Sequence, residues 1–228
     1  IKALSVGQKY RSSRVFNEII TEFEQSVKNE GVKKINLCDF TSWYFAPGID
    51  VAYEYYIDRF VRNGFRKIGE CINYELDLLS FRIPVRMTRT ENALKDEGII
   101  IKAAAKEDED RVSKWVHETF WPPWDYETTL AFEGDEAGVW IAEDSDKNLL
   151  GFSVYGGLEP TWFGPIGVVE TARRRGIGSI LLYRCLESMR SLGKRYITIP
   201  WTSNLFFYSQ LSIIKEIRHF WKMEKIIK

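Results

Sequence analysis

The chain has 228 residues, enough for one large domain or two small ones with a substantial core. Hydrophobic residues make up 45% of the sequence and charged residues 28%, as is typical of globular proteins. Lysine plus arginine and aspartate plus glutamate each number 32, so the sequence lacks the basic excess of a nucleic-acid-binding protein. No apolar run is long enough to span a bilayer, and the N-terminus does not resemble a signal peptide. We therefore expect a cytoplasmic protein with no nucleic-acid or membrane partner.

Cysteine and histidine are few and scattered. The three cysteines, Cys38, Cys71 and Cys185, are odd in number and far apart, which favours reduced core residues over disulfides. The two histidines, His117 and His219, have no close-spaced ligand motif around them. We therefore expect no metal.

The first half of the chain predicts a short series of elements. An apolar strand pattern at 4–6 leads into a polar turn that carries arginine, and a helical stretch follows. This helix ends at Gly31, which is placed as a C-cap. The strand KKINLCDF, an aromatic-rich helical stretch and the strand CINYELDL complete this half. Residues 79–98 are charged, contain proline and show weak periodicity, so we interpret them as a linker.

The second half predicts a longer series. It begins with a strand at IIIKAA, an amphipathic helix at KEDEDRVSKWVHETF and a loop with a short helix at WPPWDYETTLAFEGD. A hairpin of GVWIAED and LLGFSVYGG and a strand at WFGPIGVV follow. A turn, a helix, a strand at RYITIPW, a helical stretch and a strand at HFWKMEKI complete the series. The acidic start of the first helix suits the helix dipole.

The two halves share one pattern at an offset of 162 residues. The positions that coincide are Val6 with Val168, Arg11 with Arg173, Gly31 with Gly193 and Lys33 with Arg195. The match is ungapped through strand, turn, helix and strand, so chance is a poor explanation. The first half shows only the back portion of the order found in the second.

The turn VVETARRRGIGS joins a strand to a helix in the second half. The first N–H groups of a helix lack intrahelical partners and, with the helix dipole, can bind an anion. Gly176 and Gly178 have no Cβ, so a phosphate can approach the backbone closely. The arginines at 173–175 add positive charge, and Ser179 can donate another hydrogen bond. The turn matches neither the dinucleotide-binding fingerprint nor the Walker P-loop.

This stretch resembles the motif of the GCN5-related N-acetyltransferases (GNAT), V-x-x-x-x-(Q/R)-x-x-G-x-(G/A) after the fourth strand. Arg173, Gly176 and Gly178 occupy the required positions. The resemblance implies an α+β fold, a twisted mixed sheet flanked by helices, with acetyl-CoA as co-substrate and no metal. It covers 99–228 as a complete domain and 1–78 as the rear half of a second one. The whole chain therefore resembles a tandem GNAT protein.

The resemblance also implies a set of binding residues. The backbone of Ile166 and Val168 would pair with the pantetheine arm of acetyl-CoA and polarise its thioester carbonyl. The full cofactor-binding set is Ile166, Val168, Arg173, Arg174, Arg175, Gly176, Ile177, Gly178, Ser179 and Asn204.

The first half departs from the motif. Arg14 and Phe16 stand at the two glycine positions, where we expect their side chains to fill the space that a pyrophosphate needs. We expect this copy to be degenerate, with a structural role. Its front strands are missing from the sequence, which starts at Ile1, so we expect a preceding segment.

Tyr208 matches the tyrosine that in the family commonly protonates the departing thiolate of coenzyme A. A phenol, whose ordinary pKa is about 10, stays protonated at neutral pH and can do this; the alternative is a core aromatic. The spacing from Asn204 to Tyr208 is shorter than usual in the family, and Leu211 and Ser212 replace its Gly-Phe. This departure affects the role of Asn204 more than that of Tyr208.

The general base and the acceptor site are less defined. Glu170, Glu159, Asp125 and Glu127 are the candidate bases for deprotonating an amine. Trp121, Trp124, Asp125 and Glu127, in the proline-broken acidic segment, are the candidate substrate residues. Trp162 and Trp201 could also form an apolar or cation–π wall for an amine substrate, but ordinary core packing explains these two residues at least as well.

The sequence therefore predicts an N-acetyltransferase that transfers an acetyl group from acetyl-CoA to a primary amine by direct attack in a ternary complex. The acceptor is a small-molecule amine or a peptide, and the protein is a monomer or homodimer. Two alternatives remain. One is a non-catalytic acetyl-CoA-binding regulatory module, and the other is a structural interaction protein held by aromatic packing.

Overall fold

The computed structural model describes residues 1, 3–11, 13–37 and 46–227. Cys38 lies outside the described residues. The chain forms two compact units. Unit 1 comprises Ile1–Asn73, Trp201–Gln210 and Ile217–Lys228, and unit 2 comprises Tyr74–Pro200 and Leu211–Glu216. Two long strands, β3 (Arg66–Asp77) and β9 (Ile214–Ile226), contribute residues to both units.

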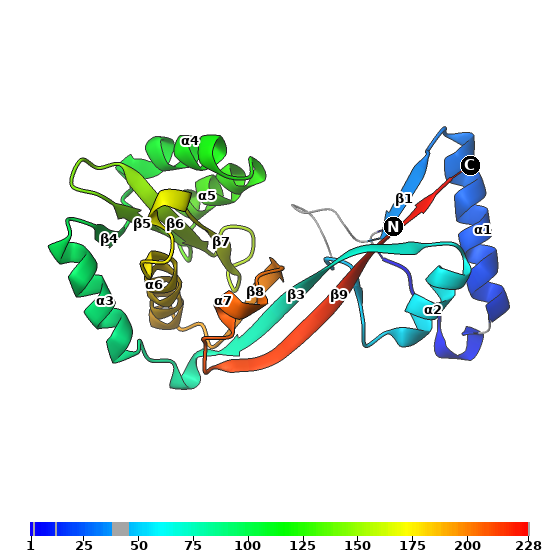
Figure 1. Ribbon diagram of the computed structural model, residues 1–228. Helices are drawn as coiled ribbons and strands as arrows, with labels where there is room; N and C mark the ends of the chain where they lie inside the picture. The colour runs from blue at the N-terminus through cyan, green and yellow to red at the C-terminus, as the bar shows by residue number, and fades with distance from the viewer. Residues whose placement is uncertain (2, 12, 38–45, 228) are drawn as a thin grey trace. The chain divides into compact units, whose positions relative to one another are not determined.

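Unit 1 combines helices with part of a five-stranded sheet. Its elements are η1 (Gln8–Tyr10), α1 (Ser13–Asn29), β1 (Lys34–Leu37), β2 (Ile49–Asp50), α2 (Glu54–Arg62), α7 (Leu205–Tyr208) and the greater part of β3 and β9. The strand order is β1-β9-β3-β8, where β8 is Tyr196–Thr202, and β2 also pairs with β9. Figure 1 shows β3 and β9 side by side. Both β1 and β2 are antiparallel to β9, with Lys34 opposite Ile226 and Ile49 opposite Trp221.

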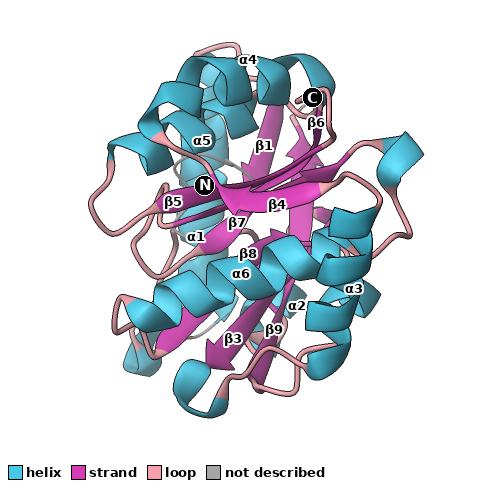
Figure 2. Cartoon of the chain, turned by 90° about the vertical axis from the view of Figure 1, so that its left-hand side faces the viewer, coloured by secondary structure: helices cyan, strands magenta, loops and turns pink. Residues whose placement is uncertain are grey.

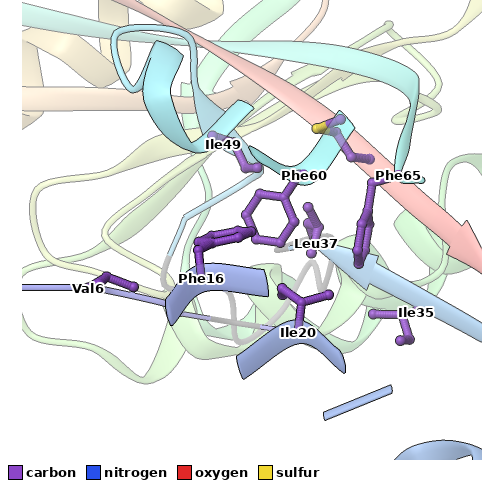
Figure 3. Close-up of a cluster of buried hydrophobic side chains, with 9 residues drawn as sticks. Val6, Phe16, Ile20, Ile35, Leu37, Ile49, Phe60 and Phe65 are labelled. Atoms are coloured by element: carbon purple, nitrogen blue, oxygen red, sulfur yellow. The ribbon is translucent and has the colours of Figure 1, made fainter. Parts of the chain in front are cut away.

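The core of unit 1 is a cluster of aliphatic and aromatic side chains (Figure 3). Its buried members are Val6, Phe16, Ile20, Ile35, Leu37, Ile49, Phe60, Phe65 and Met223. The expected strand at 4–6 does not form. Instead of pairing with a strand, the backbone N–H of Val6 donates to the hydroxyl of Tyr56 at 3.1 Å, and that hydroxyl lies 3.3 Å from the Val6 carbonyl.

Unit 2 is built on a four-stranded antiparallel sheet of order β4-β5-β6-β7. These strands are β4 (Ile100–Ala103), β5 (Gly138–Glu143), β6 (Leu149–Tyr155) and β7 (Phe163–Val168), and the expected hairpin is β5 and β6. The helical elements are η2 (Leu78–Ser80), α3 (Val85–Asp96), η3 (Lys106–Asp108), α4 (Glu109–Thr119), α5 (Pro123–Glu133), η4 (Glu170–Ala172) and α6 (Ile177–Ser191).

Helices cover both faces of this sheet (Figure 2). Because strand side chains alternate between faces, Ile141 of β5 packs with Val112 and Val116 of α4, whereas the next residue, Ala142, packs with Leu94 of α3 and Ile180 of α6. The sheet therefore places α4 and α5 on one side and α3 and α6 on the other.

Two segments are more helical than the sequence indicates. The segment WPPWDYETTLAFEGD, expected to be a loop with a short helix, forms the 11-residue α5, because a proline is tolerated in the first helical turn. The expected linker at 79–98 contains the 12-residue α3, whose Leu94 is 3% exposed. Its weak periodicity reflects a helix that buries one narrow face.

The offset of 162 residues seen in the sequence recurs in the geometry. The 3-10 helices η1 and η4 span equivalent residues, and α1 and α6 end at equivalent residues. Gly31 has φ of 78° and Gly193 has φ of 80°, each accepting the left-handed turn that ends its helix. In each case the glycine N–H and the N–H of the next residue donate to carbonyls of the last helical turn, at 2.9–3.1 Å.

Cys71 and Cys185 are free and buried, and burial raises the pKa of their thiols to about 11 and about 12. Among the described residues, no group of three or more potential metal-ligating side chains comes together, and no helix is long and apolar enough to cross a membrane.

Candidate functional site: an open strand edge and a phosphate-sized turn

The outer edge of β7 presents backbone groups that β6 does not use. Val169 N–H donates to Leu150 O at 2.9 Å, which marks these two residues as a hydrogen-bonded pair. Hydrogen-bonded and non-bonded pairs alternate in an antiparallel ladder. The backbone groups of Val168 and Ile166, which lie opposite Gly151 and Ser153, therefore point away from β6.

The neighbouring strand on that side, β8, belongs to the other sheet. The two are linked at one position by a parallel bridge between Trp162 and Thr198, where Thr198 N–H donates to Thr161 O at 2.9 Å. Beyond this bridge, in the described part of the chain, β7 and β8 form no strand pairing. The N–H groups of Ile166 and Val168 are thus placed to pair with an extended ligand that carries amide groups.

The turn after β7 is shaped by two residues in the left-handed region. Arg174 has φ of 61° and Gly176 has φ of 89°, a conformation that costs glycine little. A Cβ on Gly176 would also lie 2.7 Å from Thr90 Cγ2 of α3, which is closer than real Cβ contacts. Backbone conformation and the contact with α3 both require glycine here.

The N-terminus of α6 leaves a row of donors. The first bond of the helix runs from Ile180 N–H to Gly176 O at 3.0 Å. In the part of the chain that the structure describes, the N–H groups of Ile177, Gly178 and Ser179 have no acceptor. Ile177 is 1% exposed and fixes this turn in the core. The donors, together with the helix dipole, suit an anion.

The three arginines have three different environments. Arg173 Nε donates to Val168 O at 3.1 Å, which joins the turn to the end of β7. The guanidinium of Arg175 forms an ion pair with Glu97. Arg174 is exposed, and its side chain makes no hydrogen bond or ion pair with the described residues.

The α5 side of unit 2 carries most of the other candidates. Glu127 is half-buried, forms no ion pair or side-chain hydrogen bond within the described residues, and burial raises the pKa of its carboxyl to about 7. Asp125 Oδ2 lies 2.8 Å from Nδ1 of His117. Glu159 and Glu170 are exposed. Partial burial and a pKa raised to about 7 make Glu127 the strongest of the four candidate bases.

The two candidate tryptophans differ. Trp124 packs against the core, with its ring centroid 6.0 Å from that of Phe120 and 6.2 Å from that of Phe152. Trp121 is 46% exposed. These positions give Trp124 a packing role and leave the Trp121 ring accessible.

Tyr208 and Asn204 belong to unit 1, whereas the turn and Glu127 belong to unit 2. Tyr208 is 6% exposed, and its ring meets that of Phe207 edge-on with centroids 4.9 Å apart. Asn204 is exposed at the start of α7, and its N–H donates to Thr202 Oγ1 at 2.9 Å.

Two residues of the site, Thr90 and Glu97, have no signal in the sequence. Both lie in the segment whose pattern indicates a linker. Their contacts with Gly176 and Arg175 join positions that are far apart in the chain, so only the folded structure reveals them.

Comparisons with known proteins agree with this geometry. Residues 101–209 match the model of the acetyltransferase (GNAT) family. No curated protein sequence matches the chain. Among solved structures, the chain is similar to a fungal multi-domain GH3 β-N-acetylglucosaminidase with a GCN5-related glucosamine N-acetyltransferase region. The TM-score is 0.77 at 16% identity, over 98% of this chain and 29% of that chain.

Two further GNAT structures are also similar over nearly the whole chain. A GCN5-related N-acetyltransferase from Sphaerobacter thermophilus gives a TM-score of 0.67 at 14% identity, over 98% of this chain and 71% of that chain. A tandem GNAT protein from the clavulanic acid biosynthesis pathway gives 0.59 at 13% identity, over 99% and 74%.

The fold is therefore the mixed α+β fold of these GNAT structures, with antiparallel sheets flanked by helices. Residues 101–209 therefore match a family whose general reaction is acyl transfer, and the fold of the chain agrees with that match. GNAT acetyltransferases generally use acetyl-CoA and act on amine acceptors.

Proposed function

We propose that the chain is an N-acetyltransferase that transfers the acetyl group of acetyl-CoA to a primary amine. The observation that carries this proposal is the open edge of β7, which runs directly into the turn at Gly176 and the free N–H groups of α6. An extended amide-bearing arm followed by a pyrophosphate is the ligand that matches this order of donors.

The residues fit each part of the co-substrate. The backbone N–H groups of residues 177–179 would hold the pyrophosphate, and glycine at position 176 lets the turn keep its left-handed conformation against Thr90. Ile166 and Val168 would pair with the pantetheine amides. The open N–H groups on this edge would also polarise the thioester carbonyl.

Two side chains of the protein would then move protons during the transfer. Acetyl-CoA supplies an activated acyl group, so the amine nitrogen forms a bond to the acyl carbon as the carbon–sulfur bond breaks. Glu127 would accept the proton that the amine loses. Tyr208 would donate a proton to the departing thiolate. The transfer is direct, in a ternary complex, without a covalent bond to the enzyme.

We further propose that unit 1 contains a degenerate second copy of the rear half of a GNAT domain. The support comes from the equivalent 3-10 helices, the equivalent helix ends and the matching bond from Arg11 Nε to Val6 O at 3.3 Å. Phe16, at a glycine position of the motif, is 0% exposed and stacks edge-on with Phe60 at 5.1 Å. The Tyr56 hydroxyl is bonded to the Val6 N–H, the group equivalent to the Val168 N–H.

Arg14 differs from the expectation that it fills the pyrophosphate space. Its side chain is 86% exposed and pairs with Glu18 at 2.8 Å. Phe16 and Tyr56 therefore account for the proposed loss of cofactor binding in this copy. We propose a cytoplasmic enzyme, acting as a monomer or homodimer on a small-molecule or peptide amine, with no metal.

The test has two parts. Calorimetry measures acetyl-CoA binding, and a thiol-release assay measures turnover against a panel of amines. The panel includes glucosamine, because one structural relative contains a glucosamine N-acetyltransferase region. We expect binding and turnover, and we expect Gly178→Glu to abolish both by filling the site. Binding without turnover on any amine would indicate a regulatory acetyl-CoA-binding module instead, and absence of binding would refute the proposal.

A further inference from the structure

We propose that the three adjacent arginines divide into two positioning residues and one ligand-binding residue. Arg173 and Arg175 hold the turn in place from two sides, and Arg174 alone contacts a phosphate of the bound nucleotide. This inference rests on the proposed binding of acetyl-CoA and assigns the roles within that site.

The role of Arg173 follows from its counterpart in unit 1. Arg173 Nε bonds to Val168 O at 3.1 Å, and Arg11 Nε bonds to Val6 O at 3.3 Å. The first turn has Arg14 and Phe16 in place of the two glycines, yet it keeps this bond. A bond that persists where the glycines are gone belongs to the architecture of the turn, so Arg173 fixes the end of β7 against it.

The role of Arg175 follows from α3. Its ion pair with Glu97 connects the turn to the C-terminal end of that helix. The helix is itself firmly attached to α6, because Arg184 donates two hydrogen bonds to Glu91 at 3.1 and 2.5 Å and Leu94 is buried in the same cluster as Ile177.

Most of α3 therefore acts as a fixed support for the turn. The helix also limits the space at Gly176 through Thr90. It lies outside the 101–209 segment that matches the family model. The support is thus not part of the matched segment, and Glu97 neutralises the charge of Arg175 on the protein side.

Arg174 is the one arginine of the three that has no partner among the described residues, so we assign it to the ligand. Its guanidinium is exposed and unpaired within the described residues, next to the unpaired N–H groups of α6. Its φ of 61° is uncommon for a non-glycine residue, and such conformations concentrate at functional sites. A guanidinium can donate two parallel hydrogen bonds to a phosphate.

Variants at Arg174 test the ligand role. Arg174→Asn keeps a residue that tolerates the left-handed conformation but removes the charge, and Arg174→Lys keeps the charge. We expect the asparagine variant to weaken acetyl-CoA binding by about ten-fold or more, and to reduce its dependence on salt concentration, while lysine restores most of the affinity. Unchanged affinity and salt dependence in Arg174→Asn would overturn the proposal.

A charge exchange tests Arg175. Arg175→Glu alone should weaken binding, and the double variant Arg175→Glu with Glu97→Arg should recover it, because the ion pair re-forms in the opposite direction. If Arg175 itself contacted the phosphate, the double variant would place a carboxylate there and stay weak. That result would overturn the positioning role.

Arg173→Gln completes the series. We expect weaker binding with a smaller loss of salt dependence than in Arg174→Asn, since the removed charge does not contact the phosphate directly. A reduced salt dependence equal to that of Arg174→Asn would contradict the assignment. The wild-type protein is titrated in parallel: no acetyl-CoA binding there would refute the proposed function and this inference together, whereas wild-type binding with the wrong variant pattern refutes only the inference.

Discussion

Glu127 shows how folding can change the pKa of one carboxyl group among many. The chain contains 32 acidic residues, and several of those near the site are exposed or paired. Glu127 lies on α5 in a half-buried position, and burial is the cause that raises its pKa to about 7. A base with a pKa near neutrality is both available to accept a proton and strong enough to do so.

Replacing Glu127 should reveal this pKa in both activity and stability. We expect kcat/KM of the wild type to rise with pH through about 7, as the carboxyl becomes ionised, and we expect Glu127→Gln to lose that rising limb. A pH–rate profile of both proteins with the best amine substrate makes the measurement. An unchanged profile would remove Glu127 as the base.

The stability effect has the opposite sign to that of a typical salt-bridged carboxylate. Because the folded-state pKa is raised, ionisation opposes folding, and stability is lost as pH rises from the ordinary glutamate value to about 7. We expect Glu127→Gln to be more stable than the wild type by ~1–3 kcal/mol at pH 8, with the difference vanishing near pH 4. Denaturant melts at both pH values check this, and equal stability at pH 8 would contradict it.

Tyr208 offers a second test at the level of one residue. As a general acid it would protonate the thiolate, so Tyr208→Phe should lower kcat by about 10²-fold or more while leaving acetyl-CoA affinity nearly unchanged. Steady-state kinetics and calorimetry separate the two effects. Because the side chain is 6% exposed, a thermal melt serves as the folding control. A variant with wild-type kcat would show that Tyr208 has only a packing role.

At the scale of elements, the site is a junction of β7, the turn and α6, supported by α3. The strand determines where the outward N–H groups lie, and the helix supplies the unpaired donors at its first turn. Two residues, one in α3 and one at its C-terminal end, support the turn. Thr90 lies close to Gly176, and Glu97 forms an ion pair with Arg175. The shape of the proposed anion site thus depends on α3, a helix to which we assign no donor for the anion.

Gly176→Ala tests this junction against a matched control. Gly193, at the other end of α6, has a similar positive φ of 80°, but a Cβ added there would meet no atom of the described residues within 4 Å. Both alanine variants should lose ~1–2 kcal/mol from backbone strain. Gly176→Ala alone should also lose acetyl-CoA binding, measured by calorimetry. Equal affinity in the two variants would mean that the turn does not form the phosphate site.

At the scale of the whole molecule, the two halves of the sequence do not correspond to the two units of the structure. In the large sheet, β9 from the end of the chain lies between β1 and β3 from its beginning, and β3 lies between β9 and β8. The last strand of each half therefore neighbours strands of the other half. Unit 1 therefore has a structural role in the large sheet, whether or not it binds a ligand.

Phe16 tests whether unit 1 has only that role. We expect one acetyl-CoA per chain in the wild type. Phe16→Ala should destabilise the protein by ~3–5 kcal/mol, because it empties the centre of a core cluster, without changing the stoichiometry. Arg14→Ala, at an exposed site, should change stability little. Calorimetric stoichiometry and melting curves provide the measurements, and two bound molecules per chain would contradict a single site.

The sequence by itself determined the local parts of this protein. The β5–β6 hairpin, the strand β7, the turn with Gly176 and the helix α6 are encoded by residues close together in the chain, so alternation, glycine spacing and helical periodicity predict them. The motif also indicated the GNAT resemblance, which the family match and the fold support.

Tertiary structure decided what depends on long-range contacts. These are the helical nature of α3, the different partners of the three arginines, the burial that raises the pKa of Glu127, and the strand order β1-β9-β3-β8. Each requires groups that are far apart in sequence to meet, and no local pattern specifies which of them will.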